Sequence, residues 1–145
     1  MCNFVQKCLT RRILCVKTVV RCGMNTKEAK FETKLADKLF FAKQLDNLGL
    51  ERKYTGYYLL IDIMQILINE GKRVSSFSKE VYPIVSKRYN VSECTIERNI
   101  RSIICKCWSK DMIMKLNIFR IEEDRPTCCE FIYMVKNYIL QQILY

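Results

Sequence analysis

Apolar residues along most of the chain recur at steps of three and four, the spacing of one face of an α-helix. After Met24 this periodicity predicts helices over 26–48, 56–70, 76–89, 93–109 and 111–117, and a last helix that begins at Thr127. Gly49 and Gly71 follow the first two helices and predict their C-terminal ends. The few β-branched residues do not outweigh this periodicity. The sequence therefore predicts an all-α fold, a compact bundle of about six helices.

Each predicted helix has an apolar stripe that we expect to face the core. In the first helix the stripe contains Phe31, Leu35, Leu39, Phe40, Ala42, Leu45 and Leu48. The later stripes contain Leu60, Ile63, Met64, Leu67, Ile68, Phe77, Val81, Ile84, Val85, Tyr89, Phe131, Met134, Val135, Tyr138 and Ile139. Pro83 predicts a bend in helix 76–89, because proline removes a backbone donor. Tyr57, Tyr58 and Trp108 are interpreted as core residues rather than as surfaces for base stacking.

Helices 76–89 and 93–109 are joined by a tight turn, Asn90-Val91-Ser92, a spacing typical of a helix-turn-helix. Ser92 is a favourable N-cap for the second helix. The inward stripe of that helix is Ile96, Ile100, Ile103, Ile104 and Cys107. Its opposite side carries Cys94, Thr95, Glu97, Arg98, Arg101, Ser102 and Cys105, with Thr95 on the flank and Glu97 at the margin. That side faces the major groove in such motifs, where arginine matches guanine edges and glutamate accepts from cytosine. The alternative is a solvated charged face.

The charge balance supports a polyanionic partner. The chain has 25 Lys and Arg against 15 Asp and Glu, a net charge of +10. A balance of this kind favours nucleic acid or an anionic surface, although many small basic proteins bind neither. Within the predicted helices, the basic excess is greatest over 76–110, which holds the helix-turn-helix. Four lysines and arginines lie at helix ends or on flanking helices, where phosphate contacts usually originate: Lys79, Lys87, Arg88 and Lys110.

Histidine is absent and the chain has nine cysteines. Without histidine the chain lacks His-based triads, histidine metal ligands and the usual general base near neutral pH. No C-x-x-C pair and no glycine-rich phosphate loop is present, so we expect no enzyme activity, no cofactor and no metal site. The cysteines are interpreted as reduced cytoplasmic thiols that act as small apolar side chains. Redox sensing at Cys105 is the alternative.

Residues 1–23 form a basic segment that holds four cysteines. Three charges interrupt its apolar stretch, Arg11, Arg12 and Lys17, so it offers neither a clean signal peptide nor a membrane span. An amphipathic surface helix and a strand remain as alternatives. Asn25 and Glu28 have capping-box spacing, which favours a functional chain that begins near Met24. We therefore expect a single domain over 24–145, preceded by a segment that is disordered or not native.

Four stretches carry a resemblance to a known family. They are LGLERKYTGYYLL (48–60), KEVYPIVSKRYNVS (79–92), TIERNIRSIICKCWSK (95–110) and RPTCCEFIYMV (125–135). Through them, residues 45 to about 139 resemble the C-terminal effector domain of the sporulation stage-zero response regulator, protein A. The resemblance implies a bacterial six-helix domain that binds a short promoter box as tandem or head-to-tail pairs and regulates transcription. It also accounts for Pro83, since the family has a proline at that place.

The resemblance implies roles for individual residues. Glu97 takes the place of a glutamate that contacts bases, and Arg98 and Arg101 take the places of arginines that contact DNA. Lys79 lies near the start of the first motif helix, where the family contacts phosphate. Ser92, at the start of the second motif helix, belongs to the same predicted DNA-binding set.

Thr95 and Ser102 depart from the family pattern. Thr95 stands where the family usually has an arginine that reads guanine, and Ser102 stands where a histidine is usual. Threonine can touch a thymine methyl or a phosphate, but it cannot form the bidentate guanine pair. Losing one such pair costs about 1–3 kcal/mol of discrimination. We therefore expect an altered box or weaker binding.

The resemblance also defines the expected partners. Only 44 residues precede it, whereas a receiver domain needs on the order of a hundred, so we expect an effector that acts without its own phosphoreceiver. The expected partner is double-stranded DNA, with a homodimer on tandem sites and the RNA polymerase sigma subunit as further candidates, and no membrane. The alternative function is an interaction module that does not bind DNA and modulates a full-length relative or the polymerase. The family places polymerase contact after the recognition helix, here about Asp111 to Asn117.

Overall fold

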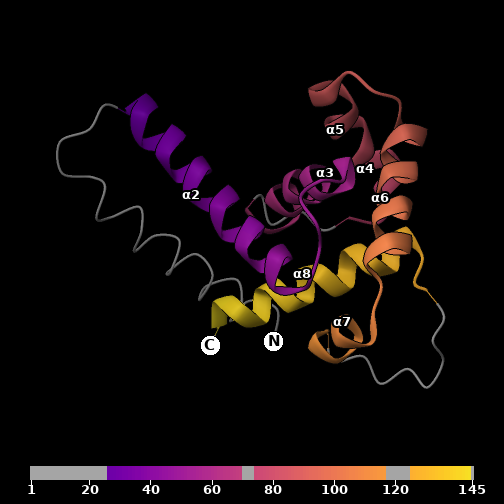
Figure 1. The fold of residues 1–145 in the computed structure, drawn as a ribbon. Coiled ribbons are helices and arrows are strands. Elements are labelled where there is room, and N and C mark those ends of the chain that lie inside the picture. The colour runs from indigo at the N-terminus through magenta and orange to yellow at the C-terminus, as the bar shows by residue number, and fades with distance from the viewer. Residues whose placement is uncertain (1–25, 70–73, 117–124, 145) are drawn as a thin grey trace.

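The computed structural model describes residues 26–69, 74–116 and 125–144, with side chains from residue 37 onward. Every regular element in these ranges is a helix, which confirms the all-α prediction (Figure 1). The elements are α2 (Thr26–Asn47), α3 (Thr55–Met64), a π-helical turn η1 (Gln65–Asn69), α4 (Phe77–Glu80), α5 (Tyr82–Tyr89), α6 (Glu93–Cys107), α7 (Lys110–Lys115) and α8 (Cys128–Leu144). The predictions about residues 1–23, the start near Met24 and the helix end at Gly71 lie outside the described residues.

Helix α3 is the centre of the fold. It packs against α2, α5 and α6, while α8 packs against α6 (Figure 1). Eight of its ten residues are buried, and its apolar side chains surround the helix on nearly all sides. A helix of this kind is stable only inside other helices, because each fully buried Leu or Ile side chain contributes about 1.5–3 kcal/mol. The core built around α3 therefore fixes where α6 lies.

Most predicted core positions that the structure describes are buried or partly buried, but three side chains are exposed, and the side chains of Phe31 and Leu35 lie outside the described residues. Leu39 is 64% exposed and Tyr58 is 49% exposed, and Tyr89 is also exposed. In α2 the buried stripe runs through Phe41, Leu45 and Leu48, and Leu39 lies about 200° from Phe41 around the helix. The core assignments of Leu39, Tyr58 and Tyr89 were therefore wrong, and Phe41, which the pattern did not single out, is a core residue.

The predicted bent helix over 76–89 is two helices in the structure. The chain leaves regular helix at Val81, where φ is −103° and ψ is −51°, and α5 begins one residue later. Pro83 lies in the first turn of α5, where backbone N–H groups have no partner within the helix. The proline therefore costs no hydrogen bond, and it separates two helices instead of bending one.

Three predicted helix boundaries are confirmed by their capping geometry. Gly49 follows α2 with φ at +88°, a left-handed conformation that favours glycine after a helix. Thr127 and Glu130 form a reciprocal capping box at the start of α8. The Glu130 carboxylate accepts from the Thr127 N–H at 2.9 Å, and the Thr127 hydroxyl accepts from the Glu130 N–H at 3.3 Å. Ser92 caps α6, as described below.

Candidate nucleic-acid interface

The turn between α5 and α6 is fixed by local hydrogen bonds. Asn90 adopts the left-handed conformation, with φ 52° and ψ 46°, which asparagine tolerates better than most residues. The Ser86 hydroxyl donates to the Val91 carbonyl at 2.6 Å, and the Val91 N–H donates to the Ser86 carbonyl at 3.2 Å. Ser92 then caps α6 by accepting from the Thr95 N–H at 3.2 Å. The predicted helix-turn-helix is therefore present, with a defined turn.

The two faces of α6 are those that the periodicity predicts. Its inward stripe is buried against the core and consists of Ile96, Ile100, Ile103, Ile104 and Cys107. The opposite side is open to solvent at Cys94, Arg98, Arg101, Ser102 and Cys105, while Thr95 and Glu97 are half-buried at its edges. The structure thus brings six of the seven predicted DNA-binding residues together at the start and along the outer face of α6. The seventh, Lys79, is exposed on α4.

Helix α6 lies unusually close to α3 at Gly56. A Cβ atom at this position would lie 2.6 Å from the carbonyl oxygen of Asn99 and 3.1 Å from the Cγ2 atom of Ile103. Only glycine permits this approach, because the nearest atom belongs to the backbone and cannot rotate away. Gly56 therefore sets the position of α6 on the core. Sequence reasoning missed this residue, and the available signal was a glycine inside a predicted helix.

Two of the predicted DNA-binding side chains bind each other. The Arg101 guanidinium lies 2.6 Å from a Glu97 carboxylate oxygen, an ion pair between residues four apart on one helix. The Arg101 side chain remains largely exposed, and that of Glu97 is half-buried. Among the described residues, Arg98 makes no ion pair and points its charge from the same surface. The outer face of α6 thus presents one unpaired arginine beside one arginine held by a glutamate.

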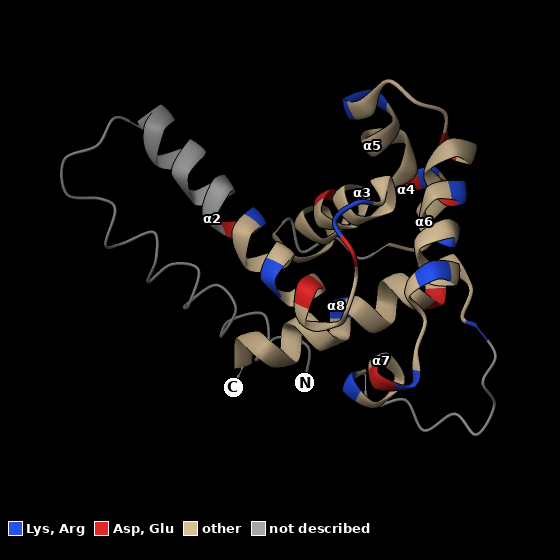
Figure 2. Ribbon diagram, viewed as in Figure 1, with Lys and Arg blue, Asp and Glu red and all other residues tan. Residues whose placement is uncertain are grey.

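Lys and Arg residues lie along α6 and again in the last turn of α5 (Figure 2). Lys87 and Arg88 lie in the last turn of α5, where positive charge is favoured by the helix dipole. Arg88 also lies 3.8 Å from the buried carboxylate of Asp62 on α3. Arg88 therefore lies near a buried carboxylate, whereas sequence analysis predicted phosphate contacts for both Lys87 and Arg88.

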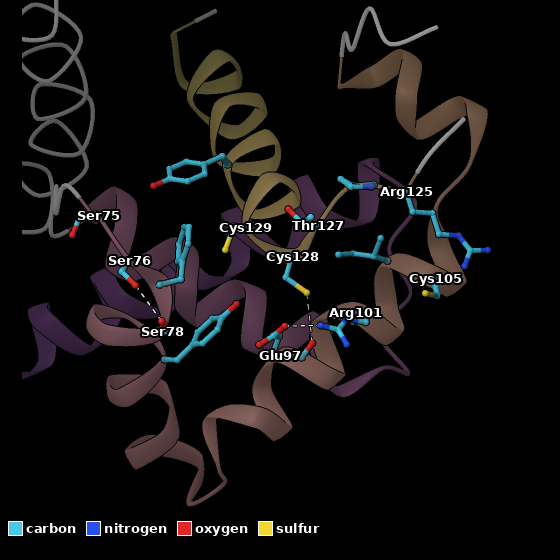
Figure 3. A pocket seen from close by; sticks show the side chains of 15 residues that line it. Ser75, Ser76, Ser78, Glu97, Arg101, Cys105, Arg125, Thr127, Cys128 and Cys129 are labelled. Atoms are coloured by element: carbon cyan, nitrogen blue, oxygen red, sulfur yellow. Dashed lines mark hydrogen bonds and ion pairs between the residues drawn. The ribbon is translucent and has the colours of Figure 1, made fainter. Parts of the chain in front are cut away.

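A cleft of about 680 Å³ runs beside α6 (Figure 3). Its walls come from the start of α4, the side of α6 that carries Glu97 and Arg101, and the start of α8. The Cys128 thiol donates to the Glu97 carbonyl at 3.7 Å and so joins α8 to α6. Burial raises the pKa of Cys128 and of Cys129, so both remain protonated at neutral pH.

The cysteines that the structure describes are only partly packing residues, because Cys94, Cys105 and Cys129 are exposed. All five of those described are free thiols: Cys94, Cys105, Cys107, Cys128 and Cys129. Two of them, Cys107 and Cys128, are buried in the core. No group of three or more His, Cys, Asp or Glu side chains in the described ranges is arranged to hold a metal ion.

An all-α domain whose exposed basic helix follows a fixed tight turn belongs structurally to the helix-turn-helix class. Residues 41–139 match the family described as Sporulation initiation factor Spo0A C terminal. The chain belongs to this family, and it therefore contains a DNA-binding effector domain of the sporulation-initiation type. The motif resemblance is confirmed, with a match that starts four residues before the predicted position 45. Over the described residues, no helix combines the length and apolar character needed to span a membrane.

Proposed function

We propose that this protein is a sequence-specific regulator of transcription that reads duplex DNA through the outer face of α6. The observation that carries the proposal is the division of α6 into a stripe buried on α3 and an opposite side that exposes two arginines. Such a helix enters the major groove and presents its outer side chains to base edges. In this arrangement Arg98 is the principal guanine-reading side chain, because it has no intramolecular ion pair among the described residues.

Arg101 and Glu97 act as a coupled pair. The carboxylate fixes the guanidinium in one orientation, so the two side chains reach the groove together. In DNA, Arg101 contacts a guanine or a phosphate while Glu97 accepts from a cytosine amino group. Ser102 lies one residue beyond Arg101 on the exposed side and adds a hydroxyl donor or acceptor. Lys79, outside the groove, supplies a phosphate contact.

Thr95 has a different role from the arginine usual at this place. Its hydroxyl lies 2.8 Å from the Ser92 hydroxyl, and its N–H donates to the same oxygen. The hydroxyl is thus engaged in the cap of α6, which leaves the methyl group to contact a thymine methyl. We infer that the recognised site has a thymine where relatives read guanine.

The test is selection of bound duplexes from a random pool by the full chain, followed by fluorescence-anisotropy titration of the selected site and a scrambled duplex. We expect one enriched sequence, with affinity for both duplexes falling as salt rises. Arg98→Ala should reduce affinity for the selected site by about 1–3 kcal/mol. Lys43→Ala, which removes an exposed charge from α2, is the charge-matched control and should have little effect. Enrichment of no sequence would refute specific recognition.

A second function, contact with RNA polymerase, is favoured by the surface of α7. Met114 on α7 is 78% exposed, so this apolar side chain is available to a partner. Lys115 joins α7 to the end of α2 by donating to the Asn47 carbonyl at 2.8 Å, and it also pairs with Asp111 within α7 at 2.7 Å. Met114→Gln should therefore weaken capture of the polymerase sigma subunit while DNA affinity stays unchanged. Equal capture by the variant would remove α7 from this role.

A further inference from the structure

Asp62 on α3 is the one acidic residue that is buried among those the structure describes, with 4% of its surface exposed. A buried carboxylate without partners would be strongly unfavourable. Its Oδ1 atom lies 3.3 Å from the Lys38 ammonium and 3.8 Å from an Arg88 guanidinium nitrogen. Burial, and then the neighbouring Asp62 carboxylate, raise the pKa of the Tyr89 hydroxyl. One carboxylate thus binds side chains from α2 and α5.

One partner of Asp62, Arg88, lies directly before the turn between α5 and α6. Arg88 and Tyr89 are the last two residues of α5, and Asn90 follows them in the left-handed conformation that directs the chain into α6. Because Asp62 belongs to the buried central helix, its bonds attach the end of α5 to a rigid element. The position of the turn, and with it the start of α6, therefore depends on a residue outside the motif.

Asp62 also makes the two basic residues at the end of α5 unequal in their freedom to bind phosphate. Lys87 is exposed and makes no ion pair with any described residue, whereas its neighbour Arg88 is attracted to a carboxylate that is almost excluded from water. Salt screens such a pair less than it screens a surface pair. A phosphate must compete with Asp62 for Arg88 but not for Lys87.

We propose that Asp62 is a positioning and specificity-determining residue, which holds the turn in place and withholds Arg88 from the DNA backbone. This inference rests on the proposed DNA-binding function. Phosphate contacts strengthen binding to every sequence equally, so restraining one cation lowers non-specific affinity without weakening the base contacts of α6.

Salt dependence of binding to a scrambled duplex tests the restraint on Arg88. Each phosphate contact adds about 0.9 to the slope of log affinity against log salt, equivalent to about threefold between 50 and 200 mM. Lys87→Ala should lower the slope by about 0.9, and Arg88→Ala should leave it unchanged. Asp62→Asn should raise it by about 0.9, and adding Arg88→Ala should reverse the gain. Equal effects of the two single alanine variants would overturn the proposal, even if Asp62→Asn did not fold.

Asp46→Asn is the matched control. Asp46 on α2 also pairs with an arginine, Arg52, and accepts from the Tyr57 hydroxyl, but it lies away from the turn. Amide hydrogen exchange, measured on the protein without DNA, tests the positioning role of Asp62 independently of DNA binding. Asp62→Asn should speed exchange of the Val91 amide at least fivefold, and Asp46→Asn should not. If wild-type protein bound no DNA, this exchange result would still test the positioning role. Unchanged exchange in Asp62→Asn would overturn that role.

Discussion

Gly56→Ala is expected to destabilise the fold by forcing α3 and α6 apart. The added Cβ would lie 2.6 Å from the Asn99 carbonyl oxygen, well inside contact distance, and 3.1 Å from two further atoms. No rotation of a side chain relieves a clash with backbone, so the helices must separate by several tenths of an ångström. Over-packing of this kind costs about 1–3 kcal/mol. The higher helix propensity of alanine offsets up to about 1 kcal/mol, which leaves a net loss of about 1–2 kcal/mol.

Urea unfolding followed by far-ultraviolet circular dichroism measures this loss, and Trp108 fluorescence provides a second probe beside the core. Gly49→Ala is a useful comparison, because its Cβ would have no atom within 4 Å and its cost comes from the positive φ alone. The variants therefore separate a clash between helices from local backbone strain. A Gly56→Ala protein as stable as the wild type would show that α3 and α6 do not approach as closely as described.

Three further predictions concern the recognition helix, a helix cap and pH. Thr95→Arg should gain about 1–3 kcal/mol for a site with guanine at the corresponding position, measured by competition titration; no gain would refute the placement of this residue. Thr127→Ala should cost about 1 kcal/mol in urea unfolding, because it breaks the capping box of α8, and an unchanged midpoint would contradict that geometry. The hydrogen bond from Arg52 lowers the pKa of Asp46, so this carboxylate stabilises the fold at neutral pH. Its contribution is lost as pH falls below about 4. In urea unfolding at a series of pH values, the free energy of unfolding of Asp46→Asn should therefore fall less steeply below about pH 4 than that of the wild type.

Three helix boundaries and the faces of α6 were predictable because they depend on neighbouring residues. Ser92, Thr127 and Gly49 act within one turn of the helix that they begin or end, so their effect is readable in sequence. The same holds for the inward stripe of α6, since 3.6 residues per turn place its isoleucines on one side whatever surrounds them. The Glu97–Arg101 pair also follows from spacing alone, although sequence reasoning treated the two residues separately.

Tertiary packing decided which apolar positions of a helix meet the core and which polar groups meet each other. Leu39 and Phe41 are both apolar, and only the angle at which α2 crosses α3 buries the second and exposes the first. Likewise Asp62 reads in sequence as a polar interruption in an apolar helix, yet it binds residues 24 and 26 positions away. Periodicity determines a direction around one helix axis, whereas contacts between helices depend on the distance and angle between two axes. The sequence by itself therefore specified the exposed face of α6, and the packed structure determined how that face is held.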